Sequence, residues 1–368
     1  MTRNHHPENE RIKRRYRIHL KDARGFSEQS LDQVAMAIDR YQTYTKFADF
    51  RHFHIEKVKA FKEHLVEQNS SRTQERLSHA TVYAILKALR AFHEWLAGQR
   101  GYKQHFQFGD WEYFNPSGIA ASVAKANRPA RFATVEQIER VLAVMPASTD
   151  IERRDRALVA FTLLTGARCA ALASFRLRHV DIERRVVFQD ARSVKTKFSK
   201  TFETWFFPVG EHIEQIVIDW VRFLVEEGRW GPDDPLFPSP QKVVGASGHF
   251  EAAGLSREPW TTTGPIRRVF REAFERAGLS YFHPHSFRKT IIAFGWKACG
   301  NNLKRMQAWS QNFGHDSLTT TFGSYGKVRA EEQGELVRGM AKTPASDNVP
   351  IDLLEEVVAE VRARRKLG

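Results

Sequence analysis

Cysteine is scarce in this chain. Only Cys169 and Cys299 are present, and no Cys-x-x-Cys pair occurs. Small secreted domains held by disulfides carry many more cysteines, and thiolate zinc sites use closely spaced pairs. The scarcity therefore excludes a disulfide framework and a cysteine zinc site, and it favours a reducing compartment.

Long hydrophobic runs are also lacking. The first residues, M-T-R-N-H-H-P-E-N-E-R, contain no apolar segment of the signal-peptide type. No window approaches the ~18 apolar residues that a transmembrane helix needs, and internal repeats and low-complexity tracts are absent. We therefore expect a cytoplasmic protein with no membrane partner.

Acidic residues are outnumbered by basic ones. The chain has 57 Lys and Arg against 43 Asp and Glu, a formal net charge of +14. With 42% hydrophobic and 12% aromatic residues, it is too apolar for this charge to indicate disorder. A positive surface suits a polyanion, so nucleic acid is the expected partner, and a merely solvated basic surface is the alternative.

The length of 368 residues predicts two domains, each with its own core. Residues 1–25 hold many basic residues and few acids, which predicts a flexible basic arm. Apolar residues recur at helical spacing over residues 26–105, most clearly from Val82 to Leu96, so a helical domain is expected there. Residues 106–130 lose this periodicity and gather Gly and Pro, which predicts a linker.

A second domain with helices and a small antiparallel β-sheet is expected over residues 131–340. The proline-rich segment P-D-D-P-L-F-P-S-P is predicted to be a loop inside it. Residues 341–368 form a tail whose apolar stripe predicts a last helix that packs on another surface. The first elements expected in the second domain are helices at 134–144 and 154–164, strands at 186–188 and 205–209, and helices at 213–224 and 266–274.

Two histidines, an arginine and a tyrosine gather in one stretch of the second domain. The stretch contains H-P-H-S-F-R-K-T and F-G-H-D-S-L-T-T-T-F-G-S-Y-G-K-V, which supply His285, Arg288, His315 and Tyr325. A second arginine, Arg168, stands far upstream in T-G-A-R. Two fixed cations beside a phenol suggest attack on a phosphodiester, because guanidinium groups stay charged and match phosphate oxygens.

These residues resemble the tyrosine recombinase family, also called lambda-type integrases. The Arg of T-G-x-R, the H-x-x-R box, a Gly-His pair and a later tyrosine follow one another here in the family's order. The resemblance implies a mainly α fold with a small antiparallel β-sheet. It also implies that a helical core-binding domain (26–105) and an α+β catalytic domain (131–340) clamp a DNA duplex. The tail often docks on a neighbouring protomer in this family, and packing on its own chain is the alternative.

The expected chemistry is transfer of a phosphoryl group to a phenol. Arg168 and Arg288 are expected to hold the non-bridging oxygens, with His315 donating a further hydrogen bond. Tyr325 is expected to attack and form a 3′-phosphotyrosine bond that conserves the energy of the broken ester, so that no metal, ATP or other cofactor is required. The phenol has an unperturbed pKa of ~10, and His285 is the nearest candidate base.

The leaving 5′-oxygen needs a proton, which a lysine on a β-hairpin supplies in this family. Lys195, Lys197 and Lys200 all lie on the predicted hairpin. The spacing T-K-x-x-K resembles the family's hairpin pattern and favours Lys197. A plain phosphate contact is the alternative role for each of the three.

Three features depart from the family's pattern. Ala171 stands where an acidic residue commonly follows the first arginine, and Lys289 stands where a histidine commonly follows the H-x-x-R box. The segment from His315 to Tyr325 is one residue longer than is common. The departures indicate a divergent branch that keeps every principal polar group.

The sequence thus predicts a site-specific recombinase or integrase, in a mobile genetic element or at a chromosomal site. The expected partner is double-stranded DNA with a specific recombination site, bound by a homo-oligomer of dimer to tetramer size or together with related recombinases. Strand exchange is expected to pass through a four-way junction. A type IB topoisomerase, which shares the chemistry, and a DNA-binding regulator with an inactive catalytic domain are the alternatives.

Overall fold

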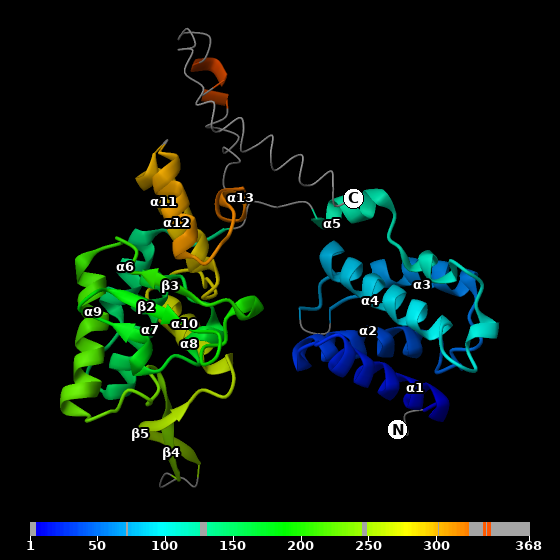
Figure 1. The fold of residues 1–368 in the computed structure, drawn as a ribbon, viewed down its shortest axis with the longest axis horizontal. Coiled ribbons are helices and arrows are strands. Elements are labelled where there is room, and N and C mark those ends of the chain that lie inside the picture. The colour runs from blue at the N-terminus through cyan, green and yellow to red at the C-terminus, as the bar shows by residue number, and fades with distance from the viewer. Residues whose placement is uncertain are drawn as a thin grey trace. The chain divides into compact units, whose positions relative to one another are not determined.

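The computed structural model describes residues 5–70, 73–125, 131–244, 249–300, 302–323, 334–335 and 337–339. The chain divides into two compact units, Met1–Pro129 and Ala130–Gly368, each coloured continuously in Figure 1. The second unit begins one residue before the predicted start of the catalytic domain. Among the described residues, no helix has both the length and the apolar character needed to cross a bilayer.

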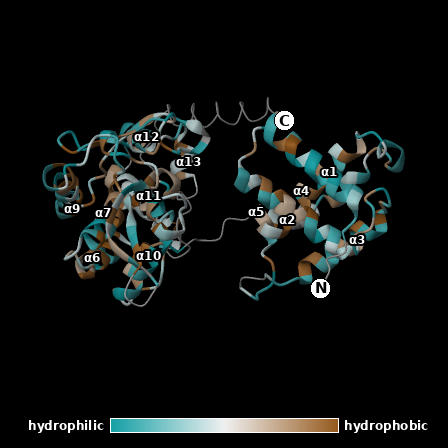
Figure 2. Ribbon diagram, turned by 90° about the horizontal axis from the view of Figure 1, so that it is seen from below, coloured by the Kyte–Doolittle hydropathy of each residue, from teal (hydrophilic) through white to brown (hydrophobic). Residues whose placement is uncertain are grey.

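The first unit is a helical bundle around one hydrophobic core. Its fully buried aromatic side chains include Phe61, Phe92 and Phe114. Figure 2 shows hydrophobic and hydrophilic residues alternating along these helices, as expected for amphipathic helices that share a core. The helices are α1 (Pro7–Ile18), α2 (Glu28–Tyr44), α3 (Ile55–Glu67), α4 (His79–Ala97) and α5 (Gly118–Lys125), with 3₁₀ turns at Lys103–His105 and Asp110–Phe114.

The prediction of a flexible arm at residues 1–25 is wrong for residues 7–23, which are helical. Residues 7–18 form α1, which continues as a π-helical turn at His19–Ala23. Ile12, Tyr16 and Leu20 recur every fourth residue and are buried in the core. In the sequence, the basic residues between them obscure this stripe. In the structure, those basic residues lie on the outer side of the same helix.

The expected linker at residues 106–130 is also wrong over much of its length. Phe114 is fully buried and contacts the ring of His93, with 4.5 Å between the ring centroids. The amine of Lys62 donates hydrogen bonds to the backbone carbonyls of Tyr113 and Asn115. This segment therefore closes the core of the first unit, even though it lacks helical periodicity.

The second unit combines helices with two antiparallel sheets. In the three-stranded sheet, of order β1-β2-β3, Val187 pairs with both Val180 and Thr204. The helices are α6 (Val135–Val144), α7 (Asp150–Thr165), α8 (Cys169–Leu172), α9 (Glu211–Arg222), α10 (Gly264–Arg276), α11 (Ser286–Cys299), α12 (Leu303–Asn312) and α13 (Leu318–Phe322). The strands are β1 (Val180–Asp181), β2 (Val186–Gln189), β3 (Phe202–Trp205), β4 (Pro238–Val244) and β5 (Phe250–Pro259).

Helix α7 is the central element of this unit. Its residues from Ala157 to Leu164 are buried on every side, and capping boxes begin both α7 and α6. Helix α7 ends at Gly166, which adopts the left-handed conformation with φ of 60°. A Cβ at Gly166 would lie 2.6 Å from Cε1 of Phe313, so that only glycine fits there.

One strand prediction and one loop prediction need correction. The strand expected at 205–209 is β3 at Phe202–Trp205, because Phe206 and Phe207 leave the ladder and pack in the core. The last three residues of the predicted proline-rich loop, Pro238 to Pro240, already belong to β4, which forms a long hairpin with β5 that projects from one end of this unit in Figure 1. Prolines cannot donate ladder hydrogen bonds, and the register shifts between Pro238 and Pro240 accommodate them.

The outer edge of β3 is covered by the side chain of Asn312 at the end of α12. Its Oδ1 accepts from the backbone N–H of Trp205 at 2.7 Å, and its Nδ2 donates to the carbonyl of the same residue at 2.8 Å. Thr204 adds a hydrogen bond from its hydroxyl to the Asn312 carbonyl at 3.0 Å. The predicted fold class, mainly α with small antiparallel sheets, is confirmed.

Candidate active site

Four of the predicted site residues lie in three separate segments of the second unit, each at a helix end or between two helices. Arg168 is the N-cap residue of α8, directly after the turn at Gly166 that ends α7. His285 is the N-cap residue of α11, and Arg288 lies in the first turn of that helix. His315 lies between α12 and α13. The fold thus brings together segments that are far apart in the sequence.

Arg288 is at the centre of the site and is only 6% exposed. Its Nη1 donates to the carbonyl of Gly166 at 2.7 Å, and its Nη2 contacts Nε2 of His315 at 2.9 Å. Its guanidinium carbon lies 4.6 Å from the centroid of the Phe313 ring. A backbone carbonyl, an imidazole nitrogen and an aromatic ring thus hold the Arg288 guanidinium in one orientation.

Arg168 brings a second positive charge to the same place. Burial, followed by the positive charge of Arg168, lowers the pKa of Arg288 to about 9. Burial also lowers the pKa of Arg168. Among the described residues, no acceptor forms a hydrogen bond with the Arg168 guanidinium. Two crowded cations of this kind form a site in which a bound anion would be strongly stabilised.

Both histidines of the site are neutral at pH 7. Partial burial, followed by the charges of Arg288 and Arg168, lowers the pKa of His285 to about 4. The same causes in the same order lower the pKa of His315 to about 4. The ring of His285 stacks on His283 at 6.2 Å and keeps an exposed face. A neutral imidazole with an accessible nitrogen can accept a proton, as the predicted role of His285 requires.

The β2–β3 loop carries the three candidate lysines. The amine of Lys200 forms a salt bridge with the carboxylate of Asp316, the residue after His315. Lys197 begins a 3₁₀ turn at Lys197–Ser199, and its side chain is exposed. The backbone N–H of Lys195 donates to Oγ of Ser174 at 2.9 Å. The loop is therefore tied to the His315 turn, and the assignment of the general acid to Lys197 stays a prediction.

Tyr325, the predicted nucleophile, lies outside the described residues, as does the whole predicted tail helix at 341–368. The last described helix before Tyr325 is α13, which ends at Phe322. Thr321 of this helix is hydrogen-bonded to His315, with 2.8 Å between Oγ1 and Nδ1. Before Tyr325, the described chain therefore reaches Gly323, two residues beyond the side chain that contacts His315.

Sequence reasoning missed several residues that shape this site. Thr321 is hydrogen-bonded to His315, and Ser310 is hydrogen-bonded to Thr321. Asp316 forms a salt bridge with Lys200. These contacts form only when the turn is folded. Hydroxyl and carboxyl residues are common, so no motif distinguished them. Among the described residues, no group of three or more His, Cys, Asp or Glu side chains is arranged to hold a metal ion.

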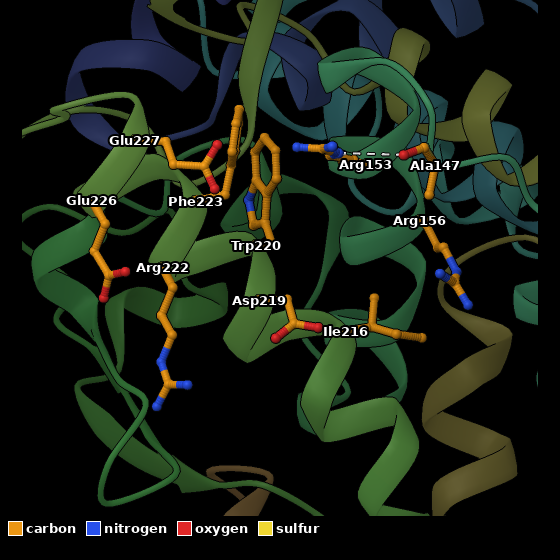
Figure 3. Close-up of a pocket in the computed structure, with 10 residues that line it drawn as sticks. All are labelled: Ala147, Arg153, Arg156, Ile216, Asp219, Trp220, Arg222, Phe223, Glu226 and Glu227. Carbon is orange, nitrogen blue, oxygen red and sulfur yellow. Dashed lines mark hydrogen bonds between the residues drawn. The ribbon is translucent and has the colours of Figure 1, made fainter.

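A separate cavity of about 400 Å³ lies against α7 and α9 (Figure 3). Arg153 donates to the carbonyl of Ala147 at 3.3 Å and stacks over the ring of Phe223 at 5.1 Å. The cavity is not a match for a polyanion, because its arginines are balanced by acidic side chains. These charged residues are Arg153, Arg156, Arg222, Asp219, Glu226 and Glu227.

Comparison with characterised sequences identifies related recombinases. Tyrosine recombinase XerC of Halalkalibacterium halodurans is 23% identical over 254 residues, which cover 67% of this chain and 71% of that protein. Tyrosine recombinase XerC of Lacticaseibacillus casei is 21% identical over 311 residues, which cover 83% of this chain and 90% of that protein.

Solved structures share the fold. A lambda integrase fragment, crystallised as a dimer bound to a core site, has a TM-score of 0.58 at 14% identity, covering 86% of this chain and 94% of that one. The XerH site-specific recombinase bound to its difH substrate has a TM-score of 0.53 at 14% identity, covering 86% of this chain and 81% of that one.

The model of the phage integrase family matches residues 131–332, more than half of the chain and nearly all of the second unit that the structure describes. This match includes Arg168, His285, Arg288 and His315 together with Tyr325. The chain therefore belongs to the phage integrase family of tyrosine recombinases.

Proposed function

We propose that this protein is a site-specific DNA recombinase that cuts and rejoins strands through a covalent bond between Tyr325 and a 3′-phosphate. The observation that carries the proposal is the pair of guanidinium groups, Arg168 and Arg288, held next to two neutral imidazoles. The burial and mutual repulsion of the two cations make the site favourable for a phosphate and unfavourable when empty.

The proposed roles follow from the chemistry of each group. Arg168 and Arg288 bind the non-bridging oxygens and stabilise the charge that develops during attack. His285, neutral at pH 7, accepts the proton of the Tyr325 phenol, and a lysine of the β2–β3 loop protonates the leaving 5′-oxygen. The phosphotyrosine then reacts with the 5′-hydroxyl of a partner strand, which restores the phosphodiester and regenerates the phenol.

The proposed partner is double-stranded DNA that carries a specific recombination site. Two duplexes must meet for strand exchange, so the protein works as a dimer or tetramer, with copies of itself or related recombinases, through a four-way junction. The lambda integrase relative has been crystallised as a tetramer on a Holliday junction, with a TM-score of 0.57. The net charge of +14 supports a DNA partner, and action on DNA places the protein in the cytoplasm.

A nicked duplex substrate tests this proposal. When the strand end next to the cut diffuses away, the covalent intermediate cannot be resealed, and the adduct accumulates. We expect the full chain to form an adduct on DNA with its own recombination site, and peptide mass spectrometry to place the DNA on Tyr325. Tyr325→Phe should bind the same DNA without forming an adduct. An adduct on another residue, or none at all with the cognate site, would contradict the proposal.

A supercoiled plasmid without the site is the control for specificity. A recombinase that requires paired sites should leave this plasmid supercoiled. Efficient relaxation would instead indicate topoisomerase activity.

A further inference from the structure

The hydrogen bonds around His315 determine which of its nitrogens carries the proton. Arginine has only donors, so Nη2 of Arg288 donates to Nε2 of His315 across 2.9 Å. The imidazole is neutral at pH 7, because its pKa is lowered to about 4. Its proton therefore lies on Nδ1, which donates to Oγ1 of Thr321 at 2.8 Å.

The chain of donors continues through two buried hydroxyls. Since Oγ1 of Thr321 accepts from His315, its own hydrogen is directed to Oγ of Ser310, 2.6 Å away. The Ser310 hydroxyl in turn donates to the carbonyl of Ser317 at 3.2 Å. Thr321 is 0% and Ser310 1% exposed, so water does not replace these partners.

This arrangement conflicts with the role expected of His315 during the reaction. A nitrogen that accepts a hydrogen bond from Arg288 cannot also donate one to a phosphate oxygen. Donation from Nε2 requires that the proton be on Nε2 and that Nδ1 accept instead. The partner of Nδ1 must then be able to reverse its direction.

A hydroxyl group can reverse, whereas a carbonyl or a carboxylate in the same place could only accept. In the reversed state Thr321 donates to Nδ1, and Ser310 donates to Oγ1 of Thr321. One proton leaves Nδ1 for solvent and one is taken from solvent by Nε2, so the charge of the imidazole is unchanged. Both hydroxyls keep a partner in either direction.

We propose that Thr321 and Ser310 are positioning residues that hold the His315 ring and allow it to change tautomer when a phosphate replaces it as the partner of Arg288. In the free protein Nδ1 carries the proton, and in the phosphate-bound protein Nε2 carries it. The tautomer of the free protein follows from the contacts alone. The change on phosphate binding rests on the proposed function of the site.

Nitrogen NMR of the full chain, with ¹⁵N-labelled histidine and arginine, tests the two tautomers directly. His315→Gln identifies the His315 signals. We expect the protonated nitrogen to be Nδ1 in the free protein at pH 7 and Nε2 after addition of orthovanadate, which imitates a five-coordinate phosphate. A free protein with the proton on Nε2 would overturn the inference at once, whatever the activity of the protein. The inference also fails if vanadate, shown to be bound by its effect on the Arg288 side-chain signals, leaves the proton on Nδ1.

Three variants separate positioning from folding. Thr321→Val keeps the shape of the side chain and removes the hydroxyl, Thr321→Ser keeps the hydroxyl, and Ser310→Ala removes the second hydroxyl. The matched control is Thr320→Val, at an exposed neighbouring position on α13. We expect Thr321→Val to slow adduct formation ~10–100-fold, as for loss of the hydrogen-bond partner that orients a metal-binding histidine. DNA affinity should stay unchanged, and Thr321→Ser should restore the rate.

The outcomes distinguish this inference from the proposed function. If the wild type forms no adduct but shows the two tautomers, the proposed function fails and the inference about the histidine stands. If the wild type forms the adduct and Thr321→Val forms it equally fast with an unchanged His315 tautomer, the inference fails alone. If Thr321→Val does not fold, Ser310→Ala and Thr321→Ser give the same comparison. A normal tautomer and rate in Ser310→Ala would then contradict the role of the hydroxyl pair.

Discussion

Nη1 of Arg288 donates a 2.7 Å hydrogen bond to the backbone carbonyl of Gly166, which joins the H-x-x-R segment to the T-G-A-R segment. The two predicted phosphate-binding arginines are thus linked by the backbone on which one of them stands. A change at the Gly166 turn should therefore affect both.

Gly166→Ala should destabilise the second unit and impair catalysis together. The added Cβ would lie 2.6 Å from Cε1 of Phe313, at a residue with φ of 60° that disfavours a side chain. Overpacking of this kind costs about 1–3 kcal/mol. Urea unfolding measures the loss, with Gly264→Ala as the control, because its Cβ would make only an ordinary 3.7 Å contact with Thr262. Equal stability of the two variants would show that the Phe313 ring moves aside at little energetic cost and would contradict the prediction.

Arg168→Gln should strongly slow adduct formation without destabilising the free protein. The charge of Arg168 adds to the burial that lowers the pKa of Arg288, so its removal relieves repulsion in the empty site. Loss of one such charge donor should slow adduct formation ~10²-fold or more. Thermal unfolding and the nicked-substrate assay measure the two effects, and Arg222→Gln at the cavity of Figure 3 controls for loss of a positive charge. A clear fall in melting temperature specific to Arg168→Gln would show that its charge is stabilising.

A sulfur-containing substrate should identify the general acid. When the bridging 5′-oxygen of the scissile phosphate is replaced by sulfur, the leaving thiol has a pKa of about 8.5 and needs no protonation. We expect Lys197→Gln to slow cleavage of the oxygen ester ~10²–10⁴-fold and to cleave the sulfur ester at the wild-type rate. Lys195→Gln and Lys200→Gln are the comparison. If one of these two shows the rescue instead, the role belongs to that lysine.

The stability of the free protein should fall as the pH is lowered from about 6.5 to about 4. His93, His285 and His315 each have a pKa lowered from 6.5 to about 4, chiefly by burial. In this interval the unfolded chain binds protons that the folded chain does not, so acid favours unfolding. Urea midpoints measured from pH 7.5 to 4.5 test this. His285→Gln should show a shallower pH dependence, and a slope identical to wild type would show that the pKa of His285 is not lowered.

The sequence predicted the parts of the fold that depend on local pattern. Helices α6, α7, α9 and α10 follow from apolar spacing and caps, and the fold class follows from the family motifs. Helix α1 was missed because its few apolar residues are dispersed among charges, although Tyr16 is only 4% exposed. The β4–β5 hairpin was missed because the prolines at its start are typical of loops.

The site was predictable to a similar extent. Arg168, His285, Arg288 and His315 were identified by motif, and the structure places them together. The contacts that orient them were not predictable, because Thr321 reaches His315 and Arg288 reaches Gly166 only after the helices pack. The roles of Tyr325 and Lys197 stay predictions.

The side chain of Asn312 has a consequence for assembly. It occupies both the N–H and the carbonyl of Trp205, where a further strand would otherwise add to the three-stranded sheet. Unpaired strand edges invite intermolecular β-pairing, and a covered edge resists it. At high protein concentration, this amide therefore protects the sheet against edge-to-edge pairing between copies, which would lead to aggregation.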